Sequence, residues 1–190
     1  MPTKPSRLNL ANAITVLRIV LVPVFIWQLM STPGWVSSER WISLALYIII
    51  AATDGLDGAL ARRRNLVTNL GKILDPIADK VLILGTLTAL SVIGQVEWWA
   101  TIVIAARELA VTVYRLTVVR HRIIAASAGG KFKTILQSIT IGLFVSPLSQ
   151  FAPEVVLKIQ VGLLALTVAL TVLTGVQYFL AGLREKPKAE

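Results

Sequence analysis

Long apolar runs separated by short polar segments dominate the chain. The runs lack the period-two alternation of half-buried strands, and most of them reach about 17 residues, enough for a helix to cross the hydrocarbon core. A spanning segment must satisfy its backbone hydrogen bonds internally, which favours helices. The pattern predicts an all-α integral membrane protein with six transmembrane helices, over residues 13–30, 41–61, 77–93, 98–119, 132–145 (continuing to 151) and 155–183.

The same pattern divides the chain into three parts. Residues 1–12 form a cytoplasmic juxtamembrane segment, residues 13–183 form the six-helix transmembrane domain that must hold any catalytic site, and residues 184–190 form a cytoplasmic tail. The composition agrees, because 55% of the residues are hydrophobic. We therefore expect no soluble domain.

The distribution of basic residues predicts the orientation. The net charge is +9, and basic residues gather in alternate connections, so the positive-inside rule places both termini on the cytoplasmic side of a prokaryotic cell (inner) membrane. Basic residues between apolar spans typically contact anionic lipids or phosphates, so no nucleic-acid partner is expected. The predicted cytoplasmic set is Lys4, Arg7, Arg62, Arg63, Arg64, Lys72, Lys80, Arg120, Arg122, Lys131, Lys133, Arg184, Lys186 and Lys188, against Arg40 and Lys158 outside, with Trp27, Trp35, Trp41, Trp98 and Trp99 toward the outer interface.

Several kinds of chemistry are excluded by what the chain lacks. It has no cysteine, so disulfides and thiolate metal sites are impossible, and His121 is its only histidine. Ser-His-Asp catalysis and histidine-rich zinc motifs are therefore poor explanations. Oxygen ligands remain.

Four aspartates form the most informative feature. Asp54 and Asp57 are about 60° apart on a helix, and Asp75 and Asp79 are about 40° apart. A mid-membrane carboxylate costs roughly 2.5–3.5 kcal/mol, so a purely structural role is a poor explanation. A short connection makes the two helices antiparallel neighbours whose carboxylates converge, and convergence requires hard cations such as Mg²⁺ or Mn²⁺ between them.

Small and basic residues beside these aspartates favour a large phosphate-bearing ligand. Gly58 and Ala61 share the helix face of Asp54, which lets a nucleotide or diphosphate approach, although such residues also serve close helix packing. Arg62 is placed to contact a phosphate, and Gly71 keeps the entry to the next helix open. Pro76 either kinks the third helix or marks its first turn.

These residues carry a resemblance to the CDP-alcohol phosphatidyltransferases, whose signature is D-x-x-D-G-x-x-A-R-x8-G-x-x-x-D-x-x-x-D. The resemblance implies a six-helix fold, a homodimer, and Mg²⁺ or Mn²⁺, with two ions. It also implies that Asp54, Asp57 and Asp75 bind metal, and that Asp79 is the general base and touches the second ion. The residues implied to line the CDP site are Asp57, Gly58, Ala61, Arg62 and Gly71. The matching residues are Asp54, Asp57, Gly58, Ala61, Arg62, Gly71, Asp75 and Asp79.

Basic residues in the second half indicate an anionic acceptor. Arg107, Arg115, Lys131 and Lys133 are the candidates for binding its phosphate, because a neutral alcohol would not need this array. The alternatives are interfacial anchoring for the two lysines and a structural ion pair with Glu108 for Arg107.

Residues 12–18, Arg107-Glu108 with Arg115, and residues 130–134 with Gln137 resemble the phosphatidylglycerophosphate synthases within that family, apart from Ala11, where those enzymes commonly have proline. This resemblance implies transfer of the phosphatidyl group from CDP-diacylglycerol to sn-glycerol 3-phosphate, with CMP released. Other acceptors, namely inositol phosphate, serine or phosphatidylglycerol, remain open. So does a non-enzymatic role as a divalent-cation transporter.

Overall fold

A computed structural model describes residues 10–32, 38–63, 69–118 and 128–184, and only the helical backbone at 10–12, 54–63, 69–76, 115–118, 128–129, 131 and 181–184. Six α-helices and one 3₁₀ turn form the described part, which contains no strand. This confirms the all-α prediction for these residues. The elements are α1 (Leu10–Ser31), α2 (Arg40–Arg63), α3 (Asn69–Val92), α4 (Trp98–Val118), α5 (Ala128–Val145), η1 (Pro147–Gln150) and α6 (Pro153–Arg184).

The start of α3 differs from the predicted start at residue 77. The helix begins at Asn69, so it includes Asp75, and Pro76 lies inside the helix rather than in its first turn. Hydropathy missed this start because Asn69, Lys72 and Asp75 interrupt the apolar residues of 69–76, whereas a helix is held by backbone hydrogen bonds that do not depend on side-chain polarity. The interpretation of Pro76 as a first-turn residue is therefore wrong.

The end of α5 also corrects the prediction, because the helix does not continue to residue 151. It stops at Val145, and Ser146 is extended, with φ −70° and ψ 151°. Proline disfavours the helical conformation of the residue before it, so Pro147 accounts for the extended Ser146. The chain then turns through η1 and enters α6.

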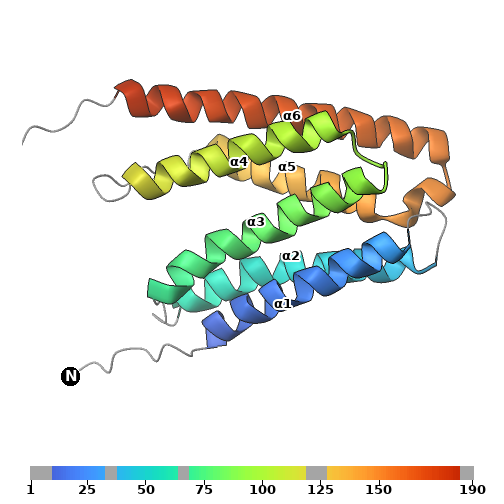
Figure 1. Cartoon of the computed structure of the whole chain (residues 1–190), viewed down its shortest axis with the longest axis horizontal. Helices are drawn as coiled ribbons and strands as arrows, with labels where there is room; N and C mark the ends of the chain where they lie inside the picture. The colour runs from blue at the N-terminus through green and yellow to red at the C-terminus, as the bar shows by residue number, and fades with distance from the viewer. Residues whose placement is uncertain (1–9, 33–37, 64–68, 119–127, 185–190) are drawn as a thin grey trace, which may run out of the picture.

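The helices form two groups of three. α1 packs against α2 and α3, whereas α6 packs against α4 and α5 (Figure 1). The groups are joined by α3, which contacts α4 and α5, and by α2, which contacts α5. α1 begins and α6 ends at the same end of the bundle, and α2 and α3 run antiparallel (Figure 1). Val22, Phe25 and Leu29 of α1 and Leu87 and Leu90 of α3 are buried in the core.

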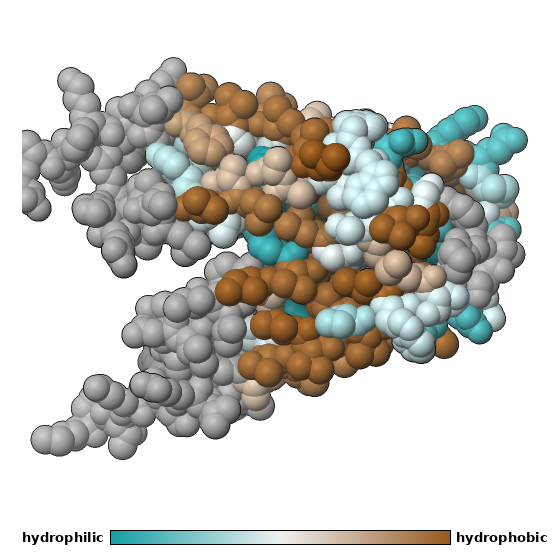
Figure 2. Space-filling view, in the orientation of Figure 1, coloured by the Kyte–Doolittle hydropathy of each residue, from teal (hydrophilic) through white to brown (hydrophobic). Residues whose placement is uncertain are grey.

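The outer surface is strongly apolar. Figure 2 shows hydrophobic side chains over both groups on the face in view, with hydrophilic atoms between the groups. Among the described residues, Ala13–Ser31 and Pro153–Leu180 are long and apolar enough to cross a membrane, while Arg40–Thr53 and Phe132–Val145 are shorter apolar stretches. Length and composition thus support two of the six predicted spans directly.

Tryptophans mark the end of the bundle where α2 and α4 begin. Trp27, Trp41, Trp98 and Trp99 are all exposed there. Arg40 starts α2 at the same end, but its side chain is fully buried and its Nη2 donates to Gln95 Oε1 at 2.8 Å. It therefore ties α2 to the turn after α3 instead of facing an interface.

Gly85 lies where α1 and α3 pack closely. A Cβ at this position would lie 2.7 Å from Ile26 Cδ1 of α1, whereas a Cβ at Gly162 of α6 would meet nothing within 4 Å. Overpacking a core costs about 1–3 kcal/mol, so we expect Gly85→Val to lower the Tm in detergent by roughly 2–10 °C. Gly162→Val is the matched control, and equal Tm values for the two variants would contradict the prediction.

Candidate active site

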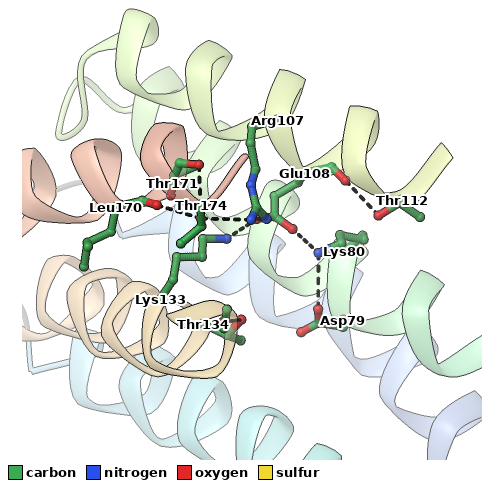
Figure 3. A network of polar contacts seen from close by, with 11 residues as sticks. Asp79, Lys80, Arg107, Glu108, Thr112, Lys133, Thr134, Leu170, Thr171 and Thr174 are labelled. Atoms are coloured by element: carbon green, nitrogen blue, oxygen red, sulfur yellow. Dashed lines mark hydrogen bonds and ion pairs between the residues drawn. The ribbon is translucent and has the colours of Figure 1, made fainter. Parts of the chain in front are cut away.

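The buried carboxylate of Glu108 on α4 contacts cationic side chains from three helices. The Glu108 side chain is only 4% exposed, and its Oε1 lies 3.0 Å from Arg107 Nη1. Oε1 also contacts Lys133 Nζ of α5, and Oε2 contacts Lys80 Nζ of α3. These side chains point toward one another between α3, α4 and α5 (Figure 3).

Asp79 belongs to the same network. Its Oδ2 lies 3.6 Å from Lys80 Nζ, so Lys80 bridges Asp79 and Glu108 (Figure 3). We refer to Asp79, Lys80, Arg107, Glu108 and Lys133 as the ion cluster. It joins the last aspartate of the signature to two of the residues predicted to bind the acceptor phosphate.

The ion cluster contains more positive than negative charge. Three cationic side chains face two carboxylates, which leaves a formal surplus of one positive charge among these described residues. A net charge in a partly desolvated site attracts a counter-ion much more strongly than a charge in water does. The arrangement is therefore suited to binding an anionic group.

The structure brings together Arg107 and Lys133, two of the four predicted acceptor residues. Lys133 is only 2% exposed, so interfacial anchoring is the wrong interpretation of this lysine. The alternative for Arg107, an ion pair with Glu108, is present. Arg115 lies on α4 and Lys131 on α5, and both side chains fall outside the described residues.

The signature residues lie on α2 and α3. Within the described side chains, no group of three or more histidine, cysteine, aspartate or glutamate residues could hold a metal ion. Asp79 is the only signature aspartate with a described side chain, so convergence of the four carboxylates stays a prediction. The side chains outside the described residues are Asp54, Asp57, Gly58, Ala61 and Arg62 on α2, and Gly71 and Asp75 on α3.

Sequence reasoning missed three parts of this site. The sequence places Lys80 only in the cytoplasmic basic set, although its position next to Asp79 is a usable signal. It indicates Glu108 only as a partner of Arg107. Thr174 and Gly175 of α6 contact Arg107, and nothing in the sequence distinguishes them from other small residues of an apolar helix.

The fold and the signature define the class of protein. The sequence matches the CDP-alcohol phosphatidyltransferase family over residues 8–173. The chain belongs to this family, whose members are enzymes that generally depend on divalent metal ions. The family resemblance is thereby confirmed.

Individual proteins with assigned names are also similar to this chain. A probable phosphatidylglycerophosphate synthase from Mycobacterium tuberculosis H37Rv is 46% identical over 177 residues, covering 93% of this chain and 83% of the relative. A CDP-diacylglycerol–glycerol-3-phosphate 3-phosphatidyltransferase from Bacillus subtilis 168 is 37% identical, covering 90% and 93%. A CMP-forming cardiolipin synthase from Streptomyces coelicolor is 38% identical over 102 residues, covering 53% and 47%.

Removing the charge of Glu108 should destabilise the bundle. Glu108→Gln keeps the size of the side chain but leaves three neighbouring cations without their shared carboxylate. Loss of one partner from a buried ion pair costs roughly 3–5 kcal/mol, so we expect a clearly lower Tm in detergent. Glu97→Gln, at an exposed carboxylate just before α4, is the control. A Glu108→Gln protein as stable as the control would show that the cluster does not depend on this charge.

Proposed function

We propose that this protein is a membrane-embedded enzyme that transfers the phosphatidyl group from CDP-diacylglycerol to sn-glycerol 3-phosphate, forming phosphatidylglycerophosphate and CMP. The observation that carries the proposal is the positively charged ion cluster, because it connects an aspartate of the family signature to Arg107 and Lys133. The names of the Mycobacterium and Bacillus relatives support the same reaction.

The proposed setting is the prokaryotic cell membrane, crossed by all six helices, with both termini and the active site cytoplasmic. The apolar outer surface and the gathering of the described tryptophans at one end support this topology. It suits the substrates, because CDP-diacylglycerol must keep its acyl chains in lipid while glycerol 3-phosphate and CMP are water-soluble. A homodimer is proposed from the family resemblance.

The donor set fits hard divalent cations because it consists only of carboxylates. Asp54, Asp57 and Asp75, with Asp79 at a second ion, would hold two Mg²⁺ or Mn²⁺ ions. When bound, such ions neutralise diphosphate charge and act as Lewis acids. Asp57, together with residues on α2 and α3 beside the aspartates, would line the CDP site, namely Gly58, Ala61, Arg62 and Gly71.

Asp79 would act as the general base. Its carboxylate takes the proton from the acceptor hydroxyl as the hydroxyl oxygen forms a bond to the phosphorus that carries diacylglycerol. The bond from this phosphorus to the bridging oxygen breaks, and CMP leaves with the electron pair. The number of phosphoester and anhydride bonds is conserved, so the reaction needs no further co-reactant.

The basic residues would hold the acceptor by its phosphate. Arg107 and Lys133 contribute from the ion cluster, and Arg115 and Lys131 are proposed to join them. A phosphate monoester offers several oxygens to guanidinium and ammonium donors, which a neutral alcohol lacks. This binding mode accounts for the surplus positive charge.

An acceptor panel tests the proposed function. Purified protein in mixed micelles with CDP-diacylglycerol and Mg²⁺ would be given radiolabelled glycerol 3-phosphate, inositol phosphate, serine or phosphatidylglycerol. We expect label in lipid, with stoichiometric CMP release, for glycerol 3-phosphate alone. Incorporation of another acceptor would replace our choice of substrate. Metal uptake into liposomes without CMP release would favour a cation transporter.

Replacing the proposed base should lower the turnover number. Asp79→Asn removes the proton acceptor, and general base catalysis typically contributes about 10²–10⁴-fold, so we expect kcat to fall by this order. The control is Glu154→Gln, at an exposed carboxylate in the first turn of α6. Binding of Mn²⁺ would be followed in parallel by electron paramagnetic resonance. Near-normal turnover with intact Mn²⁺ binding would remove Asp79 from the base role.

A further inference from the structure

The last helix contributes two residues that contact Arg107. Thr174 and Gly175 lie on α6, far in sequence from the family signature, and both are buried. We propose that they are positioning residues that hold the Arg107 guanidinium in the ion cluster and thereby set the affinity for a phosphorylated acceptor. This inference rests on the proposed function, in which Arg107 binds the acceptor phosphate.

Gly175 provides the space through which the Arg107 side chain passes. A Cβ at this position would lie 3.0 Å from Arg107 Cγ, 3.5 Å from Nε and 3.8 Å from Cδ. The contact with Cγ is tight and lies near the base of the side chain, so Arg107 would have to move by a few tenths of an ångström. A Cβ at Gly162 of the same helix would meet nothing within 4 Å. Of these two glycines of α6, only Gly175 would bring an added Cβ against Arg107.

Thr174 fixes the far end of the same side chain. Its hydroxyl donates to Leu170 O at 2.6 Å, one turn earlier on α6. This bond uses the only hydroxyl hydrogen, so the oxygen faces Arg107 as an acceptor, and Arg107 Nη2 donates to it at 2.9 Å (Figure 3). With Nη1 on Glu108 and Nη2 on Thr174, both ends of the planar guanidinium are held.

The chemical nature of Thr174 is suited to a positioning role. A hydroxyl directs the guanidinium without neutralising it, whereas a carboxylate at this place would cancel the charge needed by a phosphate. Holding a long side chain in its binding geometry also removes part of the entropy cost of binding. We therefore expect α6 to act on the acceptor and not on the nucleotide substrate.

The experiment compares steady-state kinetics of four full-length variants in micelles. Gly175→Ala places a methyl group against the Arg107 side chain, and Thr174→Val removes the hydrogen-bond acceptor of Arg107 while conserving shape. A lost hydrogen bond to a charged group weakens binding by roughly tenfold, and the effect here is indirect, so we expect the KM for glycerol 3-phosphate to rise about three- to tenfold. The kcat and the KM for CDP-diacylglycerol should stay within about twofold of wild type, since a pure binding effect leaves the chemical step unchanged.

The controls separate positioning from a general effect on the helix. Gly162→Ala makes the same substitution on α6 at an open site and should leave all constants unchanged. Thr174→Ser keeps the hydroxyl and should restore the KM for glycerol 3-phosphate to near the wild-type value. Alanine favours helices more than glycine does, so the Tm of Gly175→Ala should not fall through loss of helix propensity.

Failure of this inference can be told from failure of the proposed function. If wild type and Gly162→Ala use glycerol 3-phosphate, and both Gly175→Ala and Thr174→Val show unchanged KM values, the positioning role is overturned while the reaction stands. A wild-type protein that does not use glycerol 3-phosphate overturns both. If Gly175→Ala does not fold, Thr174→Val decides the question, because an isosteric change need not disturb packing.

Discussion

The structure depends on one constraint, which is that charges enclosed by apolar helices must be paired. The Glu108 carboxylate pairs with the charges of Lys80, Arg107 and Lys133 together. These four side chains come from α3, α4 and α5. A bundle that separated them would leave isolated charges in a low-dielectric interior, which is strongly unfavourable. The ion cluster therefore fixes the second group of helices against α3 of the first.

This constraint also connects the parts of the proposed active site. Lys80 follows Asp79 on α3 and contacts the carboxylates of both Asp79 and Glu108. The proposed base and the residues proposed to bind the acceptor phosphate therefore share one network. Because the cations outnumber the carboxylates, the network holds the helices together and still attracts a phosphate. Thr174 and Gly175 extend the network to α6 without adding negative charge.

The two ends of the bundle are built differently. At the tryptophan end, Arg40 is enclosed, and its Nη2 donates to Gln95 and to the Phe144 carbonyl. These hydrogen bonds hold α2 to the turn after α3 and to α5. Toward the other end lie the ion cluster and the part of α2 that carries the signature. The proposed reaction joins one lipid and one water-soluble substrate, and it would suit a division in which one end of the bundle packs and the other end carries the site.

The sequence by itself determined the helices and the family. Apolar runs and their period are local properties, and the spacing of Asp54, Asp57, Asp75 and Asp79 identifies the signature. The largest errors of hydropathy are at the start of α3, where a segment interrupted by polar residues stays helical, and at the end of α5, where Pro147 stops the helix. Only the tertiary structure decided that Lys133 is buried, that Glu108 gathers three cations, and that α6 holds Arg107. These contacts join residues from separate helices, and the rotation of one helix against another follows from packing of the whole bundle, which the spacing along one chain segment does not encode.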